Sequence, residues 1–465
     1  MTTSERTMTK ELAEYIVREK FESLPAEVVR LTKRCVVDGT GVMLAGSASD
    51  SGRVIQHYVR ESATAGGPAM VAGTSIKASA SLAALANGVA AHALDYDDTQ
   101  LSSTPDRIYG LMTHPTSPVL AATLAVGQEM GASGKDVITA FSTGFEVECK
   151  IAEAIDPYHY VRGMHSTGSL GIFGATAAAA KLLGLDVEQT RIALGIAASK
   201  SAGIRVNFGT MTKPYHAGAA AENGVVAARL ASIGYEANPD GLDGVWGFFQ
   251  VTAGGGEPGR IIGKLGNPYA MVNPGFSIKP YPCGSMVHPA MDTLRDLVIE
   301  EDIKPEQIKA IRCATQSHVL AGLRYADPQD ELQAKFSMNF CLGIIALRRK
   351  AGIAEFTDEV VLLPEVRAMI RRVNAYPDPN VEAEGADRMR SVVEVELNNG
   401  QVLKRTATMS RGMPQRPLTP EELAQKFTDC ASGVIPNDRI TKVTEAAYAL
   451  DEIADINTYM VLLGE

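Results

Sequence analysis

Apolar residues recur at helical spacing along most of the chain, and this pattern predicts a mostly helical protein. The first predicted helices cover residues 9–24, 25–45 and 53–62. Helices rich in alanine and glycine follow at 78–92, 118–131, 136–155, 168–183, 188–201 and 216–232. A short apolar run at 69–72 predicts one small strand. We therefore expect a large, all-helical domain at the beginning of the chain.

Strand signals begin after residue 273, where the helical pattern stops. Residues 274–289 hold a cluster of prolines and are expected to form a structured loop. Residues 308–317 approach the alternation of a strand, and a helix is predicted at 334–349. Two β-rich runs within 391–408 flank an Asn-Gly pair, which favours the tight turn of a hairpin. This part of the chain is therefore expected to fold as an α+β unit.

The change of pattern predicts two domains built from three segments. Residues 1–273 form the first part of the helical domain, and residues 274–410 form a smaller α+β lid domain. Residues 411–465 return to helix, beginning with a Thr-Pro-Glu-Glu sequence at Thr419 that is typical of a helix start. We expect them to pack back on the helical domain, so that the lid is inserted before the C-terminal helices.

The composition of the chain limits the kinds of function that the protein can have. The net charge of −10 argues against a nucleic-acid-binding surface, although a local cationic pocket can still hold a small anion. No apolar run reaches the ~20 residues of a membrane helix, and residues 1–10 lack the apolar run of a secretory signal. The six cysteines form no Cys-x-x-Cys pair and indicate no metal site. We expect a cytoplasmic protein that binds neither nucleic acid nor membrane.

An acidic cluster between two apolar helices is the first candidate site. Asp95, Asp97 and Asp98 lie within four positions, and Thr99 and His114 follow. A carboxylate, a hydroxyl and an imidazole held between rigid elements could transfer protons. Alternatively, the acidic residues cap the next helical segment. The residues alone leave both interpretations open.

Other candidate side chains lie where a predicted helix begins or in a loop stiffened by proline. Backbone N–H groups at a helix start, together with cationic side chains, favour anionic ligands. These candidates are His165, Arg205, Lys213, His216, Lys279 and, more weakly, Tyr325. A hydrogen-bonded loop histidine or a solvated lysine would explain the same residues without a site.

Taken together in one order, these motifs resemble the MmgE/PrpD family over nearly the whole chain. The matching stretches are His92-Ala-Leu-Asp-Tyr-Asp-Asp-Thr99, His114-Pro115, the small-residue helix opening at His165, Met211-Thr-Lys-Pro-Tyr-His-Ala-Gly218, and Lys279-Pro-Tyr-Pro-Cys283 with His288. The resemblance implies a helical domain with a smaller α+β lid, a homodimer, and a site between the domains that needs neither metal nor cofactor. It also implies a small di- or tricarboxylate substrate that reacts at a carbon beside a carboxylate.

The resemblance also implies roles for the candidate residues. The catalytic set would be Asp95, His114, His165, Lys213 and Lys279. Thr99, Arg205, His216 and Tyr325 would bind substrate. The lysines would hold carboxylates and stabilise the negative charge that proton removal creates. Which group acts as the base and which as the acid stays open.

Three departures from the family pattern shape the expected reaction. Residues 105–109 lengthen the interval between Thr99 and His114. The segment around Lys213 is more similar to cis-aconitate decarboxylase than to 2-methylcitrate dehydratase, whereas Gly284 replaces a histidine of the animal decarboxylase. We expect a 2-methylcitrate dehydratase-like hydro-lyase first and an iminodisuccinate epimerase-like isomerase second. A cis-aconitate decarboxylase-like enzyme and a non-catalytic carboxylate-binding homologue are the remaining alternatives.

Overall fold

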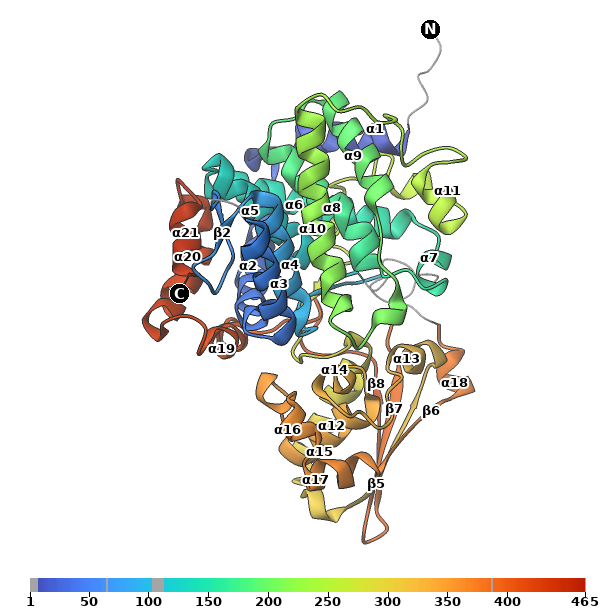
Figure 1. The fold of residues 1–465 in the computed structure, drawn as a ribbon. Coiled ribbons are helices and arrows are strands. Elements are labelled where there is room, and N and C mark those ends of the chain that lie inside the picture. The colour runs from blue at the N-terminus through green and yellow to red at the C-terminus, as the bar shows by residue number, and fades with distance from the viewer. Residues whose placement is uncertain (1–6, 64–65, 103–112, 386–387, 465) are drawn as a thin grey trace.

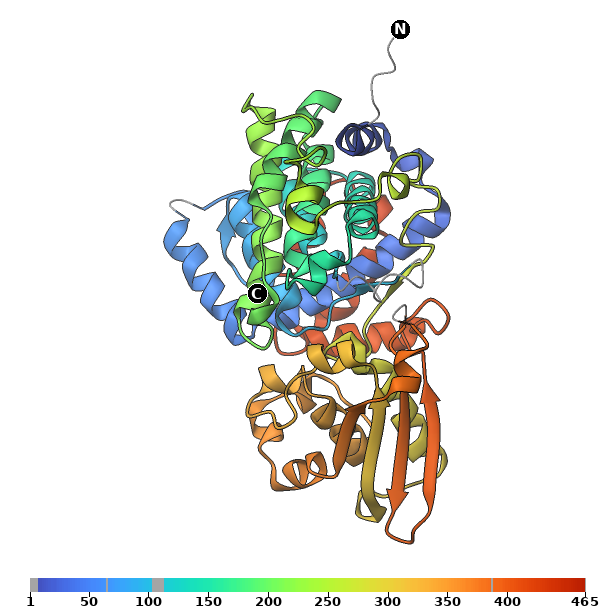
Figure 2. The same cartoon turned by 90° about the vertical axis from the view of Figure 1, so that its right-hand side faces the viewer.

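The computed structural model describes residues 7–63, 66–102, 113–385 and 388–464. Its elements form two groups, which Figures 1 and 2 show one above the other. We call the larger group the helical lobe and the smaller group, which holds a four-stranded sheet, the sheet lobe. The predicted fold class, mostly α with a smaller α+β part, is confirmed. The loop of residues 105–109 lies outside the described residues.

The helical lobe is built from both ends of the chain. The C-terminal helices α19 and α20 pack on α2, so the described chain returns to the lobe in which it begins (Figure 1). The lobe contains α1 (Met8–Arg18), α2 (Ala26–Ser47), α3 (Asp50–Ser62), α4 (Ala80–Ala93), α5 (Thr116–Met130), α6 (Gly134–Ala154), α7 (Tyr158–Val161), α8 (Ser166–Leu182), α9 (Val187–Lys200), α10 (Thr212–Ser232), α11 (Phe248–Ala253), α19 (Pro420–Ala431), α20 (Asn437–Tyr448) and α21 (Asn457–Leu462). Short pairs of strands accompany them, namely β1 (Ala69–Met70) with β2 (Lys77–Ala78), and β3 (Thr99–Gln100) with β4 (Phe276–Ser277).

Small residues let α4 and α10 lie unusually close in the centre of the helical lobe. A Cβ atom added to Gly88 of α4 would lie 2.8 Å from the Cα atom of Gly218 on α10. One added to Gly218 would lie 2.5 Å from the carbonyl oxygen of Leu85. Both helices are rich in buried alanine, so their backbones can meet with little side chain between them. This contact brings the end of α4 beside the beginning of α10.

The sheet lobe carries a mixed sheet with strand order β6-β5-β7-β8. The β5–β6 pair is parallel, whereas β5–β7 and β7–β8 are antiparallel. Val393 and Val395 of β7 are buried because alternate side chains of the strand point toward the core, where α12 packs. The lobe contains α12 (His288–Glu300), β5 (Ile308–Thr315), α13 (Ser317–Gly322), α14 (Glu331–Ala334), α15 (Met338–Arg348), α16 (Asp358–Val361), α17 (Pro364–Ile370), β6 (Val373–Pro377), α18 (Pro379–Glu382), β7 (Ser391–Leu397) and β8 (Val402–Ala407).

Some predicted boundaries were wrong. The helix expected at 9–24 ends at Arg18, because Glu19 leaves the helix and accepts a buried hydrogen bond from Tyr269. The helix expected at 334–349 is divided into α14 and α15, and Ser337 caps the second of these through its side-chain oxygen. The loop expected up to residue 289 already contains β4 and the first turn of α12.

The β3–β4 pair joins distant parts of the chain. Thr99 pairs with Ser277, and Gln100 pairs with Phe276, in antiparallel register. Lys279 therefore lies two residues beyond a strand that is fixed against the segment following Asp95. This pairing places two of the predicted motifs side by side. The domain boundaries at residues 273/274 and 410/411 stay a prediction.

No helix in the described parts of the chain combines the length and the apolar character that crossing a membrane requires.

Candidate active site

The backbone turns sharply at Asp95, immediately after α4. Asp95 adopts a left-handed conformation with φ of 51°, which few residue types other than glycine tolerate. Only 3% of its surface is exposed. Unusual backbone geometry at a buried acidic residue is a common feature of functional sites. The sequence therefore builds a rigid turn that points one carboxylate into the protein.

Two buried lysines bind this carboxylate through the same oxygen atom. Lys213 Nζ donates to Asp95 Oδ1 at 2.5 Å, and Lys279 Nζ donates to the same oxygen at 3.0 Å. Lys279 also donates to the backbone oxygen of Asp95 at 2.9 Å. Burial alone would raise the pKa of Asp95, but the two ammonium groups hold it well below its usual value. Asp95 Oδ2 is buried and accepts no hydrogen bond from the described parts of the chain.

Aromatic rings from both lobes surround the ammonium group of Lys213. Its Nζ atom lies 5.4 Å from the ring centre of Phe208 and 5.1 Å from that of Phe336. Burial lowers the pKa of Lys213, while Asp95 opposes this shift. Cation–π contacts and the ion pair together compensate for the loss of hydration. The lysine is thus held in place by residues of the helical and sheet lobes.

His114 is oriented by its own neighbouring segment. Its Nδ1 atom lies 2.7 Å from the backbone oxygen of Asp98, so it must carry the proton and donate it. Thr99 Oγ1 lies 3.3 Å from the same nitrogen. Nε2 of the neutral ring is then free to accept a proton, and it lies 3.9 Å from Asp95 Oδ1. Burial, with Lys279 next in size, keeps the pKa of His114 well below its usual value.

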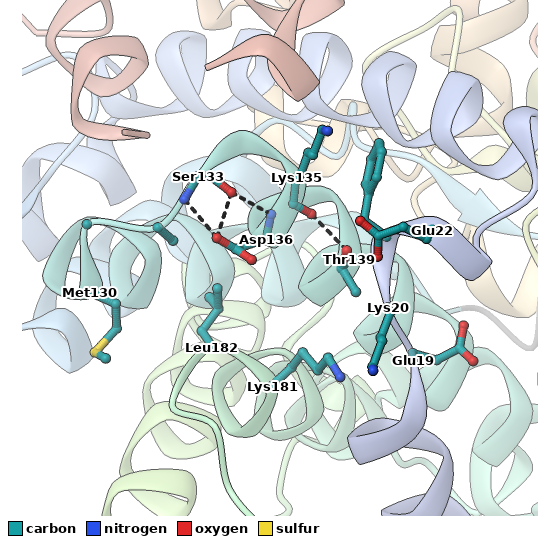
Figure 3. A pocket seen from close by; sticks show the side chains of 13 residues that line it. Glu19, Lys20, Glu22, Met130, Ser133, Lys135, Asp136, Thr139, Lys181 and Leu182 are labelled. Carbon is teal, nitrogen blue, oxygen red and sulfur yellow. Dashed lines mark hydrogen bonds between the residues drawn. The ribbon is translucent and has the colours of Figure 1, made fainter. Parts of the chain in front are cut away.

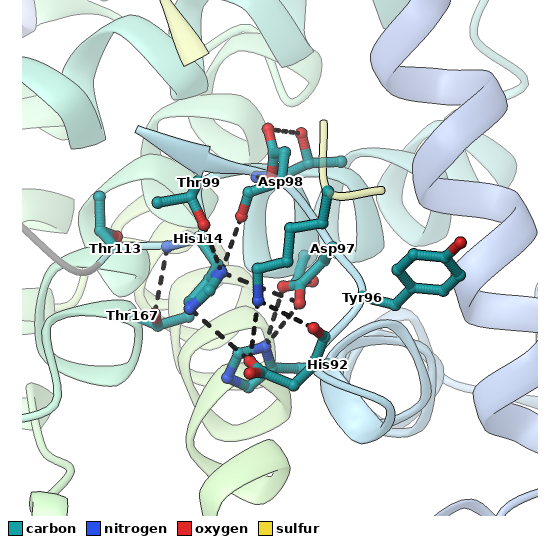
Figure 4. Close-up of polar contacts among 12 residues, drawn as sticks. His92, Tyr96, Asp97, Asp98, Thr99, Thr113, His114 and Thr167 are labelled. Carbon is teal, nitrogen blue, oxygen red and sulfur yellow. Dashed lines mark hydrogen bonds and ion pairs between the residues drawn. The ribbon is translucent and has the colours of Figure 1, made fainter. Parts of the chain in front are cut away.

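A second imidazole, His92, completes the centre of the site; the sequence analysis placed it in a family motif but gave it no role. Its Nδ1 atom lies 2.8 Å from Asp97 Oδ2, and Ser117 donates to that same oxygen. His92 Nε2 is buried, and within residues 7–63, 66–102, 113–385 and 388–464 it has no hydrogen-bond partner. Figure 4 shows His92, Asp97 and His114 gathered together, and the His92 and His114 ring centres lie 4.8 Å apart. The sequence signal that could have revealed this pair was a histidine five residues before an aspartate. The two side chains meet only because the backbone turns between them, at Asp95.

His165 and His216 form a pair beside His92. The His165 ring centre lies 5.6 Å from that of His92, and its Nδ1 atom lies 2.9 Å from Nδ1 of His216. His165 is fully buried at the start of α8, and no described residue forms a hydrogen bond with its Nε2 atom. Burial lowers the pKa of both rings, that of His216 to about 4. His216 thus contacts His165, which is itself a candidate residue.

Asp98 has a structural role that agrees with the capping interpretation. Its carboxylate accepts hydrogen bonds from the backbone nitrogen of Thr116 at 3.1 Å and from the Thr116 hydroxyl at 2.7 Å. These bonds satisfy donors at the beginning of α5. Burial, supported by the charges of Asp97 and Asp38, raises the pKa of Asp98 to about 8. The three acidic residues of the cluster therefore have three different environments.

Two other predicted residues lie farther from this centre. Arg205 donates to the Tyr160 backbone oxygen at 3.1 Å, and its guanidinium lies 3.7 Å from the Tyr160 ring centre. Tyr325 donates to the backbone oxygen of Phe208 at 3.2 Å. The structure therefore brings together Asp95, Thr99, His114, His165, Lys213, His216 and Lys279, whereas Arg205 and Tyr325 contact neighbouring residues.

Lys426 fixes the backbone around the site from the C-terminal segment. Its Nζ atom donates to the backbone oxygens of Tyr96 at 2.8 Å and Lys279 at 2.9 Å. It also forms an ion pair with Asp38 at 2.6 Å, and both side chains are buried. Helix α19 thereby holds the residues on each side of the Asp95–Lys279 contact.

A metal ion is a further ligand to consider. His92, Asp95, Asp97 and His114 offer ligand atoms that all lie within 4.8 Å of one another. Two ammonium groups already contact Asp95, so a divalent cation there would face two positive charges at short range. An anionic group would be attracted by the same charges. The arrangement therefore favours a carboxylate ligand.

A surface pocket of about 560 Å³ in the helical lobe offers no comparable chemistry (Figure 3). Several of its polar groups already have structural partners. Ser133 and Asp136 cap α6, and Lys181 donates to the backbone oxygen of Val17. The pocket contains none of the predicted site residues.

Comparison with known proteins identifies the family of this chain. The MmgE/PrpD N-terminal domain matches residues 10–260, and the C-terminal domain matches residues 281–450. Cis-aconitate decarboxylase of Homo sapiens is 25% identical over 472 residues, covering 98% of this chain and 95% of the human protein. Cis-aconitate decarboxylase of Aspergillus terreus is also 25% identical, over 485 residues, with coverage of 98% and 96%. Both family domains thus occur in the expected order, and the chain belongs to the MmgE/PrpD family.

Proposed function

We propose that this protein is a cofactor-independent lyase that acts on a small di- or tricarboxylate at a carbon beside a carboxylate. One observation carries the proposal: two buried ammonium groups share a single carboxylate oxygen. One positive charge at this point is not balanced by Asp95, and a substrate carboxylate can balance it. Preorganised cations also stabilise the negative charge that develops when a proton or carbon dioxide leaves.

The imidazoles supply the proton transfer. His114 and His92 each direct Nδ1–H toward a fixed acceptor, which leaves Nε2 able to take a proton. His165 also presents a free Nε2 atom, but its Nδ1 faces another imidazole rather than a fixed acceptor. We assign His114 or His92 as the base and His165 as the group that returns a proton. Lys213 and Lys279 hold the carboxylate beside the reacting carbon.

Arg205 and Tyr160 are suited to bind a more distant carboxylate of the substrate. The Arg205 Nε atom and the Tyr160 hydroxyl are both buried, and neither has a hydrogen-bond partner among the residues that the structure describes. Burial raises the pKa of Tyr160, the Arg205 guanidinium opposes this shift, and the charge of Asp95 adds to it, which places the hydroxyl within electrostatic reach of Asp95. Two unpartnered donors near the lysines match a ligand with more than one carboxylate. This supports a di- or tricarboxylate over a monocarboxylate.

Two reactions are supported by different observations. Dehydration of a 2-methylcitrate-like hydroxy acid needs a base and an acid, and the site offers both. Decarboxylation of a cis-aconitate-like acid is supported by the names of the relatives. Against decarboxylation, Gly284 stands where the animal decarboxylase has a histidine. A Cβ atom added at Gly284 would lie 3.0 Å from the Leu323 side chain, so a histidine would fit there only after local adjustment. Epimerisation and binding without catalysis are the remaining outcomes.

The homodimer and the cytoplasmic location also stay predictions. Several large apolar side chains on residues 204–215 are exposed, namely Ile204, Val206, Met211 and Tyr215. Such side chains are suited to an interface between subunits. Light scattering coupled to size-exclusion chromatography tests this, and a monomer at micromolar concentration would contradict it.

Proton NMR in deuterated water tests the reaction. Purified protein is mixed with citrate, 2-methylcitrate, cis-aconitate or iminodisuccinate, and Asp95→Asn serves as the inactive control. A new alkene signal from 2-methylcitrate indicates dehydration, and itaconate-like signals from cis-aconitate indicate decarboxylation. Deuterium exchange without a new product indicates epimerisation. A folded protein that changes none of these acids would contradict the proposed function.

A further inference from the structure

The contact between His165 and His216 joins two identical ring atoms. The Nδ1 atoms of the two rings lie 2.9 Å apart and form one hydrogen bond with each other. An N–H···N bond contains one proton, so one ring must donate while the other accepts. In neutral rings, the ring that accepts at Nδ1 carries its own proton on Nε2. The proton position in His216 therefore decides whether His165 presents N–H or a lone pair to the site.

This behaviour separates His165 from the other imidazoles of the site. His114 donates from Nδ1 to a backbone oxygen, and His92 faces the carboxylate of Asp97, so neither partner can supply a proton. The partner of His165 can either give or take one. Among the described site residues, only the two imidazoles of this pair have a neighbour that allows both states.

The surroundings favour a pair of neutral rings. His165 faces His92, His114, Lys213 and His216, and His216 faces His92 and Lys213. Burial is the largest cause of the lowered pKa of both rings, and these positive or ionisable neighbours add to it. At neutral pH the pair therefore shares one proton along the hydrogen bond and carries no charge.

His216 is also the more exposed ring of the pair. It keeps 8% of its surface exposed, whereas His165 is completely buried. Glycines make room for its ring, since a Cβ atom on Gly168 would lie 2.9 Å from the His216 Cβ atom. A Cβ atom on Gly203 would lie 3.3 Å from its Cγ atom. His216 is thus the member of the pair through which a proton can enter from solvent.

We propose that His216 is a positioning residue that sets the tautomer of His165 and passes protons to it from the solvent side. The inference rests on the proposed function, in which the substrate must receive a proton: at the carbanionic carbon after decarboxylation or during epimerisation, or at the leaving hydroxyl oxygen during dehydration. For a carbanionic carbon, the His165 Nε2–H bond breaks, its proton joins the electron pair on carbon, and a C–H bond forms. The Nδ1 proton of His216 moves to His165 Nδ1, and solvent protonates His216 Nε2. One solvent proton is consumed, and both rings finish as the opposite tautomers.

Three variants separate this role from simple packing. His216→Asn keeps an amide at the Nδ1 position, so it preserves the hydrogen bond but cannot pass a proton. His216→Ala leaves space for added imidazole. His159→Gln is the matched control, because His159 is a buried histidine that bonds to Ser169 of α8 and has no place in the site.

Steady-state kinetics and ¹⁵N NMR of the histidine rings provide the readouts. We expect kcat of His216→Asn to fall about 100-fold with little change in KM, and added imidazoles to restore His216→Ala according to their pKa. His159→Gln should keep the wild-type pH profile. Unchanged kcat and pH profile in folded His216→Asn would overturn the proposal while leaving the proposed function intact.

The NMR readout does not depend on turnover. Wild-type protein should show a downfield imidazole N–H signal shared by the two rings, and the signal should disappear in His216→Ala. The Nε2 shift of His165 should also change in that variant. If the signal is absent from wild-type protein, or survives in His216→Ala, the relay is wrong whatever substrate the enzyme uses.

Discussion

At the scale of single residues, the main charged groups of the site meet at Asp95. Its Oδ1 atom accepts from two ammonium groups, while Oδ2 has no partner among the described residues. A carboxylate substrate approaching the lysines would compete with Asp95 for them. The strength of substrate binding should therefore depend on each lysine separately.

Replacing Lys279 with methionine should weaken substrate binding. The Lys279→Met side chain keeps its length but loses one charge-assisted hydrogen bond, worth about 1.5–3 kcal/mol, so KM should rise about 10- to 100-fold. Steady-state kinetics with the substrate found by NMR measures this change. Lys181→Met is the control, because Lys181 lies in α8 and bonds to Val17. An unchanged KM in Lys279→Met would remove this lysine from substrate binding.

Asp98 predicts a pH dependence of stability. Burial raises its pKa to about 8 in the folded protein, whereas an unfolded aspartate titrates near pH 4. The folded state holds this proton between about pH 4 and pH 8 and the unfolded state does not, so the contribution to stability falls as pH rises. The loss approaches about 1.4 kcal/mol per pH unit in that range.

Asp98→Asn should remove this pH dependence. Thermal melts of wild-type and variant protein from pH 5 to pH 9 provide the comparison, since histidine titrations affect both proteins equally. The difference in Tm, variant minus wild type, should increase with pH. Parallel curves would show that Asp98 is already ionised in the folded protein at pH 5.

At the scale of elements, the contact between α4 and α10 sets the distance between the two halves of the site. His92 lies near the end of α4, and Lys213 lies in the first turn of α10. Gly88 on α4 and Gly218 on α10 allow the backbones of the two helices to touch. Any side chain at this contact must push the helices apart and with them the charged groups.

Gly88→Ala should therefore lower both stability and activity. The added methyl group lies 2.8 Å from backbone of α10, and overpacking of this kind costs about 1–3 kcal/mol. Urea denaturation and kcat/KM measure the two effects. Gly259→Ala is the control, because an added Cβ atom there meets nothing within 4 Å. Wild-type stability in Gly88→Ala would mean that the helices adjust without strain.

Elements with a local signal could be predicted, and elements defined by distant partners could not. The hairpin of β7 and β8 was predicted because valine alternation and an Asn-Gly pair occur within a few residues. Strand β6 was missed because its pairing is with β5, far earlier in the chain. His92 was given no role for a similar reason. Its partnership with Asp97 depends on the left-handed turn at Asp95, which no periodic pattern reveals.

At the scale of the whole molecule, a buried ion pair joins the C-terminal helix α19 to α2, near the site. Lys426 of α19 compensates Asp38 of α2, and it also fixes the backbones of Tyr96 and Lys279. Burial raises the pKa of Asp38, whereas Lys426 opposes this shift. The C-terminal helices thus contribute to the geometry of a site that is otherwise built from earlier segments.

Lys426→Met should destabilise the protein by about 3–5 kcal/mol, because it leaves Asp38 buried without a counter-ion. The double variant Asp38→Asn with Lys426→Met should recover part of this loss. Denaturant unfolding of the two single variants and the double variant gives the interaction energy. Strictly additive effects would show that the two residues do not stabilise each other.

The Lys426 contacts also have a consequence for the order in which the protein is made. Lys426 is separated by 330 residues from Tyr96, whose backbone oxygen it binds. The ribosome therefore releases the acidic turn long before the cation that fixes it. Until α19 has been synthesised, Asp38 lacks its ion pair with Lys426, and this lysine cannot yet bind the backbone oxygens of Tyr96 and Lys279. The growing chain can collapse early, but the candidate site gains these contacts only after α19 has been made.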